Sequence, residues 1–175
     1  MVGLWGASSL IESVQTGTIT WTSGASSTAT ISAVDPTRTV VFLLGSTSLY
    51  SGSVPYEAQA YVTVTNATTV TATMYATSSY QRWVGYAVVQ FAPGVIKRIQ
   101  TGTITLTAAT SNTATISEIN TAKSVLTNVG YYSTSYRYVS DYMGYFAMTN
   151  STTVTLSRAV ADLNMIGSFQ VVEFF

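Results

Sequence analysis

Apolar and polar residues alternate along much of this chain with the period of two that is typical of half-buried β-strands. Between Val14 and Trp21, Ile19 and Trp21 fall on one face and the intervening threonines fall on the other. No window shows a sustained period of 3.6 residues. The pattern therefore predicts strands and almost no helix.

Five more segments with strand-like composition, rich in Thr, Val, Tyr and Ile, follow before residue 92. They are Thr28–Ile31, Thr39–Leu44, Ala58–Thr65, Thr69–Tyr75 and Arg82–Phe91. Turn signals separate them: a Ser/Gly run, an Asp-Pro-Thr-Arg turn at residues 35–38, a long loop over residues 45–57 and an Asn-Ala turn at residues 66–67. Short strands with turns between them predict a β-sandwich.

The chain contains two copies of one pattern, because four blocks recur in the same order at offsets of 83 to 85 residues. The blocks are Gln15–Thr20 with Gln100–Thr105, Thr28–Ser32 with Thr113–Ser117, Thr65–Thr71 with Thr149–Thr155, and Val88–Phe91 with Val171–Phe174. The expected fold is all-β, with two tandem six-stranded antiparallel β-sandwich modules over residues 11–91 and 96–175 and almost no helix. Residues 1–10 are expected to form an N-terminal arm, and residues 92–95 a short, ordered joint.

The third strand differs between the two copies. Thr39–Leu44 is apolar on both faces, whereas Ser124–Val129 is polar on one. A strand that is apolar on both faces needs cover on both. The module's own core covers one face, so the sister module or another subunit is expected to cover the other, and Val41 and Leu43 are candidate partner contacts. The excess apolar surface predicts a homo-oligomer.

Composition narrows the classes of function. Lys and Arg number seven, Asp and Glu number seven, and charged residues make up 8 % of the chain, so the basic cluster that a nucleic-acid partner needs is missing. The chain has no Cys and no His, which excludes disulfides, Cys/His zinc sites and His-based catalysis. No apolar run approaches the roughly 20 residues of a membrane-spanning helix, so no membrane span is expected, and the N-terminus does not resemble a signal peptide. A secreted or cellular adhesion module stays open as an alternative.

The ionisable residues do not predict an enzyme. The acidic residues are dispersed, and no carboxylate pair recurs between the copies. Glycoside hydrolysis needs two carboxylates across a cleft, and nothing in the sequence marks such a pair. Lys97 and Lys123 are the only lysines, and neither belongs to a Ser-x-x-Lys motif that could activate a serine. We therefore expect a structural or binding protein with no catalytic residue, no metal and no cofactor.

The strongest local anomaly is a run of aromatic residues in the second copy. It comprises Tyr131, Tyr132, Tyr136, Arg137, Tyr138 and Tyr142, with Tyr145 close behind. Tyr and Arg are enriched at binding interfaces, and aromatic faces stack on sugars, so this run is a candidate site for a protein partner or a glycan. Cross-strand packing inside a sandwich is the alternative explanation.

Two pairs of polar turns occupy matching positions in the copies. Asn66 and Asn150 each begin a glycosylation sequon, and we interpret them as Asx turns rather than as modified sites. The pairs Asp35/Arg38 and Asn120/Lys123 are interpreted as solvated turns with one cation at the rim.

Residues 1–10 lie outside the repeat, carry no charge and contain Leu4, Trp5 and Leu10. A free tail is normally polar. Our hypothesis is that this arm binds another chain and that Trp5 is buried there.

The repeat unit resembles a module of tailed-bacteriophage virion proteins. The resemblance covers nearly the whole chain from residue 11. It rests on the opening Ile-x-x-Ile-Gln-x-Gly-Thr-Ile-Thr of residues 96–105, on Thr-Ala-Thr-Ile-Ser, on Asp-Pro-Thr-Arg-Thr-Val-Val, on Thr-Asn-Ala-Thr-Thr-Val-Thr-Ala and on the closing Val-Val-Glu-Phe. The unit is also distantly similar to the H-type lectins, six-stranded antiparallel sandwiches that are usually trimeric, open with a Gln-x-Gly strand and bind glycans. No sugar-binding residue carries over from them.

These resemblances imply a virion structural role and a trimer. The first hypothesis is a capsid decoration (cement) protein on the capsid surface, which binds the major capsid protein or other virion proteins and stabilises the shell. The alternative is a tail fibre or receptor-binding protein with a lectin-like, glycan-binding sandwich. The number of copies per particle separates the two, because a cement protein is present in hundreds of copies and a tail-tip protein in few.

Overall fold

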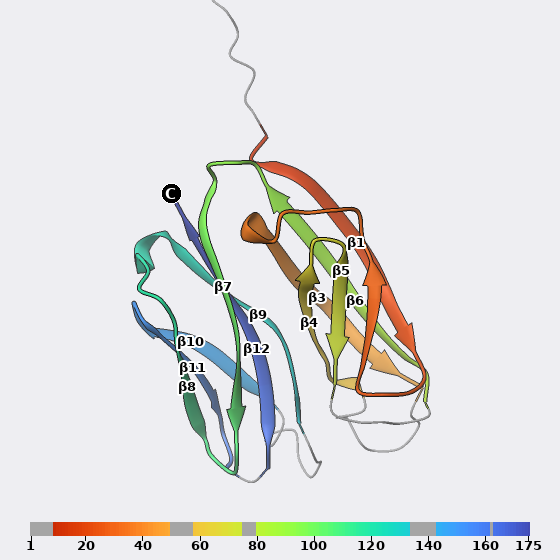
Figure 1. Ribbon diagram of the computed structural model, residues 1–175. Coiled ribbons are helices and arrows are strands. Elements are labelled where there is room, and N and C mark those ends of the chain that lie inside the picture. Colours follow the sequence, from red (N-terminus) through yellow and green to blue (C-terminus); the bar gives the residue numbers. More distant parts are fainter. Residues whose placement is uncertain (1–8, 50–57, 75–79, 134–142, 162) are drawn as a thin grey trace, which may run out of the picture.

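The computed structural model describes residues 9–49, 58–74, 80–133, 143–161 and 163–175 (Figure 1). The first half contains β1 (Ile11–Trp21), β2 (Ser26–Thr30), β3 (Thr39–Ser48), β4 (Tyr61–Asn66), β5 (Thr69–Thr73) and β6 (Arg82–Phe91). The second half contains β7 (Ile96–Leu106), β8 (Ser111–Thr115), β9 (Ser124–Ser133), β10 (Gly144–Asn150), β11 (Thr153–Arg158) and β12 (Met165–Phe174). The helical elements of the described part are two 3-10 turns, η1 (Pro36–Arg38) and η3 (Thr121–Lys123). The expected all-β class is confirmed.

The strands form sheets of three, six and three strands, with the orders β1-β6-β3, β2-β5-β4-β9-β12-β7 and β10-β11-β8. The sequence predicted two separate six-stranded sandwiches, and the hydrogen bonding differs from that, because one sheet runs across both halves. A single residue pair, Tyr61 with Gly130, joins β4 of the first half to β9 of the second. A sequence repeat shows which strands exist, but not which of their edges meet.

Strand pairing within the two halves follows the sequence repeat closely. Gln15 of β1 lies opposite Val88 of β6, and Gln100 of β7 lies opposite Val171 of β12. The alternation expected along β1 is also observed. Ile19 and Trp21 are buried, and the alternating threonines, Thr16, Thr18 and Thr20, are exposed.

The repeated Gln-Thr-Gly has a structural explanation in both halves. The Gln15 side-chain amide donates to the carbonyl of Ser32 at 3.0 Å and accepts from its N–H at 2.7 Å, and Gln100 does the same with Ser117 at 2.9 and 2.7 Å. The glycine of the motif makes room for a ring: a Cβ on Gly17 would lie 2.5 Å from the hydroxyl of Tyr86. The motif thus ties the opening strand to the next loop and to the closing strand.

The third strand continues past the position where the sequence predicted a loop. β3 extends to Ser48, because Gly45 adopts a φ of +144° at a β-bulge and pairing resumes beyond it. β9 has the same feature at Gly130, with a φ of +116°. Glycine takes this conformation at low cost, and a bulge turns the extra side chain to a new direction.

Hydrogen bonds hold the joint between the halves. The N–H of Ala92 donates to the carbonyl of Leu10 at 2.9 Å, and the N–H of Val95 donates to the carbonyl of Ala92 at 3.3 Å. Gly94 adopts a φ of +82°, which allows the tight turn. The two halves lie side by side, with β9 and β12 of the second half next to the side of the first half that carries β3 and β4, and with β7 next to η1 (Figure 1).

Candidate functional site

The contact between the two halves is an apolar interface built on the outer face of the sheet segment β7-β12-β9. Val40 of the first half packs with Ile96 and Val172 of the second in one buried cluster, flanked by Phe91 and Phe174. The rings of Phe91 and Phe174 meet edge to face with their centroids 6.1 Å apart. Pairs of this kind contribute stability beyond the area that they bury.

One side chain crosses from the second half into the core of the first. Val129 is 1 % exposed and belongs to the same core cluster as Val41, Ala60 and Val62. It is the unpaired residue of the β9 bulge, since the flanking Asn128 and Gly130 pair with consecutive residues of β12. The bulge therefore directs Val129 into the open side of the first half, between the edges of β3 and β4.

Backbone groups complete this interface. A Cβ on Gly130 would lie 2.2 Å from the carbonyl oxygen of Ala60 and 2.6 Å from the Cα of Tyr61, so only glycine fits there. The N–H of Val41, on the free edge of β3, donates to the side-chain oxygen of Gln170 at 3.0 Å. The interface thus provides a hydrogen-bond acceptor for a buried N–H on the edge of β3, and it also covers apolar side chains.

Among the described residues, the matching sheet face in the first half, the outer face of β1-β6-β3, meets the second half at Val40 and Phe91 and elsewhere exposes apolar side chains. Its exposed apolar residues are Ile11 (44 %), Val14 (57 %), Phe42 (38 %) and Leu44 (62 %). A shallow recess of about 260 Å³ lies on this face, lined by Thr18, Leu44, Gly45, Ser46, Thr47, Trp83 and Gly85. We call this surface the open face. These apolar residues share the face with the exposed threonines of β1, and exposed apolar surface of this kind makes the face a candidate interaction site.

The two faces of β3 meet different surroundings. Val41 is fully buried and Leu43 packs against the same core, which also holds Val129 of the second half, so these two candidate partner contacts lie against the core and the sister half. The alternate residues of β3 point outward: Val40 meets the second half, while Phe42 and Leu44 stay exposed. The alternation along β1 places Val14 on the same face as the exposed threonines, and this pattern could have predicted the open face from the sequence.

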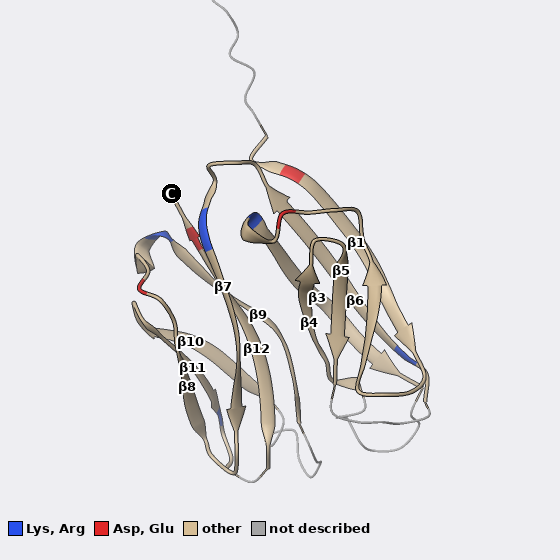
Figure 2. Cartoon of the chain, in the orientation of Figure 1, with Lys and Arg blue, Asp and Glu red and all other residues tan. Residues whose placement is uncertain are grey.

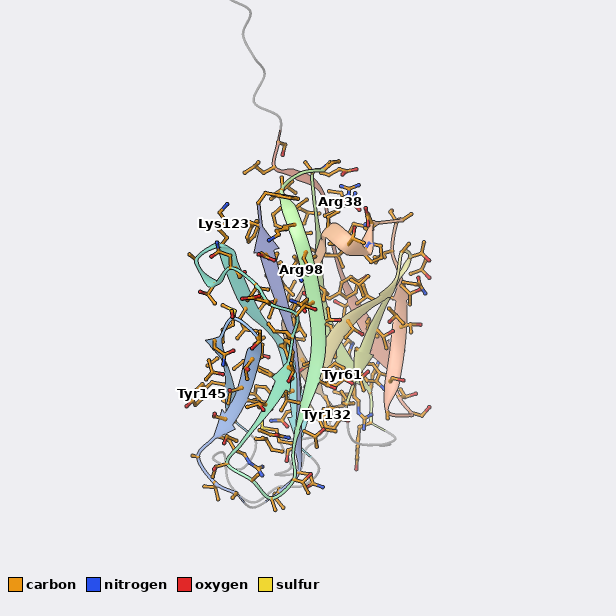
Figure 3. The ribbon with its side chains drawn as sticks, turned by 60° about the vertical axis from the view of Figure 1, so that its left-hand side comes forward. Arg38, Tyr61, Arg98, Lys123, Tyr132 and Tyr145 are labelled. Carbon is orange, nitrogen blue, oxygen red and sulfur yellow. The ribbon has the colours of Figure 1, made fainter. Side chains whose placement is uncertain are left out.

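The tyrosine run is only partly within the described residues. Tyr136, Arg137, Tyr138 and Tyr142 lie outside them. Tyr132 stacks on Tyr61 across the two halves with ring centroids 5.7 Å apart, and this burial raises the pKa of Tyr132, with a smaller contribution from Tyr61. Figure 3 shows these two rings together, with Tyr145 on the outside of the second half, where it is 65 % exposed.

A recess of about 460 Å³ opens beside this tyrosine stack. It is lined by Leu43, Ser46, Ala58, Gln59, Ala60, Asn128, Gly130, Tyr131 and Met143. The hydroxyl of Tyr131 donates to the sulfur of Met143 at 2.9 Å. Tyr131 and Tyr132 therefore serve cross-strand and inter-half packing, while Tyr131 also presents part of its ring to the recess.

Most of the charged residues gather at the end of the molecule where β1 and β7 begin (Figure 2). Glu173 is buried there and accepts bonds from Lys97 at 2.8 Å, from Arg98 at 3.0 Å and from the N–H of Asn120 at 3.0 Å. These donors, Lys97 first, lower the pKa of Glu173 to about 2.

The first half has a weaker version of this cluster. Arg38 bonds Glu12 and Asp35, and the pKa values of both carboxyls are lowered, chiefly by Arg38 for Glu12 and by the Thr37 hydroxyl and N–H for Asp35. Both carboxylates are exposed, so these contacts make a solvated turn of the kind expected from the sequence.

The two sequons form Asx turns. The side-chain oxygen of Asn66 accepts from the N–H of Thr68 at 2.9 Å, and that of Asn150 accepts from the N–H of Thr152 at 2.8 Å. This is the structural role expected for both residues. In the N-terminal arm, Leu4 and Trp5 lie outside the described residues, and Leu10 is 67 % exposed.

Within the described ranges, no group of three or more acidic residues could hold a metal ion, and no helix of this part is long and apolar enough to cross a membrane. The candidate site is the open face together with the recess beside Tyr131. Comparison of the chain with protein-family models, with curated proteins and with solved structures found no match.

Proposed function

We propose that this chain is a non-enzymatic structural protein of a tailed-phage virion, and that it decorates and stabilises the capsid shell. The observation that carries the proposal is the open face, on which Ile11, Val14, Phe42 and Leu44 expose apolar side chains. A decoration protein needs exposed apolar surface of this kind, because it contacts neighbouring copies of itself as well as the shell, and apolar burial is the dominant favourable term in most protein association.

The proposal includes a finer description of the fold. Each half is one copy of a six-stranded sandwich module, in which β1-β6-β3 faces β2-β5-β4 and β7-β12-β9 faces β8-β11-β10. Its support is that each half has its own core cluster and that the same Gln and Asn side chains make the same bonds in both. The resemblance of the repeat unit to phage virion modules links this fold to the proposed location.

The number of copies per particle tests the role. Antibodies raised against the purified chain would be used to identify particles that carry it, and quantitative mass spectrometry would count copies relative to the major capsid protein. We expect hundreds of copies per particle, on the capsid surface. A few copies, located at the tail, would replace the decoration role with the tail role, and absence from particles would contradict both.

A second experiment tests the N-terminal arm, whose Leu4 and Trp5 are the predicted anchor. Residues 1–10 would be deleted, and the occupancy of the truncated chain on stripped particles would be compared with that of the full chain. We expect a loss of occupancy with an unchanged unfolding midpoint. Equal occupancy would show that the arm is not an anchor.

The recess beside Tyr131 favours one alternative, a tail fibre or receptor-binding protein that binds glycan. Its volume of about 460 Å³ fits a sugar residue, and it combines an aromatic ring with the polar side chains of Ser46, Gln59 and Asn128. Binding to a glycan array that is lost in Tyr131→Ala would support this role, and no binding by the wild-type chain would exclude it.

A further inference from the structure

The interface between the halves joins one surface of the first half to a different surface of the second half. Because the halves are repeats, each half also has a counterpart of the surface that the other half uses, and these two counterparts are not in contact with each other. The second half receives the first half on the outer face of β7-β12-β9. The first half docks there with its open side, the edges of β3 and β4. The counterparts are the open face on the first half and, on the second, the edges of β9 and β10, which we call the docking edge. Of the docking edge, the internal interface uses β9 at Gly130, where it pairs with β4.

The two bulges show the correspondence most clearly. At the repeat offset of 85 residues, Val129 corresponds to Leu44 and Gly130 to Gly45. Leu44 is the unpaired residue of the β3 bulge, as Val129 is of the β9 bulge. Val129 is 1 % exposed inside the core of the other half, whereas Leu44 is 62 % exposed. The chain therefore carries a second side chain of the same kind, directed outward from the same bulge, and no core of the described residues receives it.

The two bulge glycines also differ in how closely other atoms pack on them. A Cβ on Gly130 would collide with the backbone of Ala60 and Tyr61, whereas a Cβ on Gly45 would meet nothing within 4 Å. Gly45 instead lines the recess on the open face, together with Gly85 and Trp83. The space over Gly45 is thus free at the place where a backbone segment packs closely in the second half.

The docking edge is exposed at the matching residues. Val40, which is buried against Ile96 and Val172, corresponds to Val125, which is 51 % exposed. Tyr61, which stacks at the interface, corresponds at the offset of 84 residues to Tyr145, which is 65 % exposed. Six of the twelve large apolar residues that are exposed in the described ranges thus lie on these two surfaces.

We infer that a second copy of this chain is the partner of the open face, and that it binds through its docking edge in the arrangement that already joins the two halves. Leu44 of one chain inserts between β9 and β10 of the next, near Leu126 and Phe146, as Val129 inserts between β3 and β4. Val125 of that next chain packs near Ile11 and Val89. The contact joins two different surfaces, so its repetition gives a closed ring, or a filament where the rotation does not close. This inference does not depend on the proposed virion role.

Disulfide cross-linking tests the arrangement directly, because the chain has no cysteine of its own. Ile11→Cys and Val125→Cys would be made as separate full-length proteins and oxidised alone and as a mixture. We expect a disulfide-linked dimer only in the mixture, since Val125 of one chain meets Ile11 of another. Efficient cross-linking of either variant with itself would indicate a symmetric pairing of like faces, and the absence of cross-linking in the mixture would also overturn the inference.

A mass measurement with a matched pair of variants gives the second test. The wild-type chain is expected to sediment as an oligomer at tens of micromolar, and Leu44→Asp is expected to reduce the mass to that of one chain without shifting the unfolding midpoint of that monomer. Leu49→Asp is the control, because Leu49 is equally exposed at 62 % and lies outside the proposed contact. A monomeric wild type, an unchanged mass for Leu44→Asp, or dissociation of the control as well would each contradict the proposed contact.

Discussion

The two halves of this chain share a strand order and several side-chain hydrogen bonds, but the corresponding sheet face is buried in the second half and exposed in the first. In the second half the outer face is closed, because the first half packs on it and Val129 enters the neighbouring core. In the first half the corresponding face is open, and Leu44 points to solvent. A duplicated module thus needs only one contact to join its copies, and the other copy of each surface stays available for a partner.

The halves also differ at one buried polar position on the last strand of each half, which is Gln90 in β6 and Glu173 in β12. Gln90 in the first half accepts from the N–H of Asp35 at 2.8 Å, and Glu173 in the second half accepts from the N–H of Asn120 at 3.0 Å. The neutral side chain needs only that donor, whereas the carboxylate is also paired with Lys97 and Arg98. A buried carboxylate requires such compensation, and only the second half supplies it.

Substitutions of the two bulge residues should show the largest difference in stability between the halves. Val129→Asp places a carboxylate in the core of the first half and is expected to lower the free energy of unfolding by more than about 3 kcal/mol. Leu44→Asp changes an exposed position, and its effect on the monomer should stay within about 0.5 kcal/mol. Urea unfolding followed by tryptophan fluorescence measures both. Equal losses for the two variants would show that the halves do not differ at this face.

The bulge glycines offer a finer comparison. Both Gly45→Ala and Gly130→Ala place a side chain at positive φ, so both lose some stability to backbone strain. Gly130→Ala must also displace the backbone of Ala60 and Tyr61, and we expect it to cost about 2 kcal/mol more than Gly45→Ala. Chemical denaturation of the two variants under identical conditions checks the difference, and a smaller loss for Gly130→Ala would contradict the close packing of the halves.

The acid dependence of stability should come partly from Glu173. Its pKa is about 2 in the folded chain, below the ordinary value of 4.5. The ion pairs therefore stabilise the fold fully above about pH 4.5, and this contribution is lost as the pH falls from there through about 2. Glu173→Gln should remove this dependence and remain folded, because Gln90 fills the same position in the first half. Thermal melts between pH 2 and 6 compare the two chains, and identical pH profiles would argue against the ion pairs.

The smallest effect is expected at the two Asx turns, where the halves are alike. Asn66→Ala and Asn150→Ala each remove one exposed side-chain bond to the backbone, and each should cost about 0.5 kcal/mol. Melting temperatures of the two variants should fall by similar amounts. A large loss in one half alone would reveal a role for that turn beyond the local bond.

Local patterns predicted much of the fold. The alternation along Val14–Trp21, the turn residues and the repeat offsets indicated the strands, and the Asx turns at Asn66 and Asn150 were anticipated. The strand beyond Gly45 was missed because a glycine followed by serine is read as a turn, whereas here a bulge lets pairing continue.

The candidate site was harder to predict, because its location depends on contacts between distant residues. The apolar excess of the third strand was recognised, but Val41 and Leu43 were assigned to the partner surface, and the outward residues are Phe42 and Leu44. The pairing of Tyr61 with Gly130, which joins the halves in one sheet, leaves no signal in the sequence of either strand. The two halves had to be placed side by side before the closed face and the open face could be distinguished.

An experimental structure of the protein in its assembled form, by crystallography or electron microscopy, tests the account most directly. We expect Leu44 of each chain to lie between β9 and β10 of a neighbouring chain, in the same relation that Val129 has to β3 and β4 within the chain. A structure in which Leu44 faces solvent in every copy, or in which two open faces pair with each other, would contradict it.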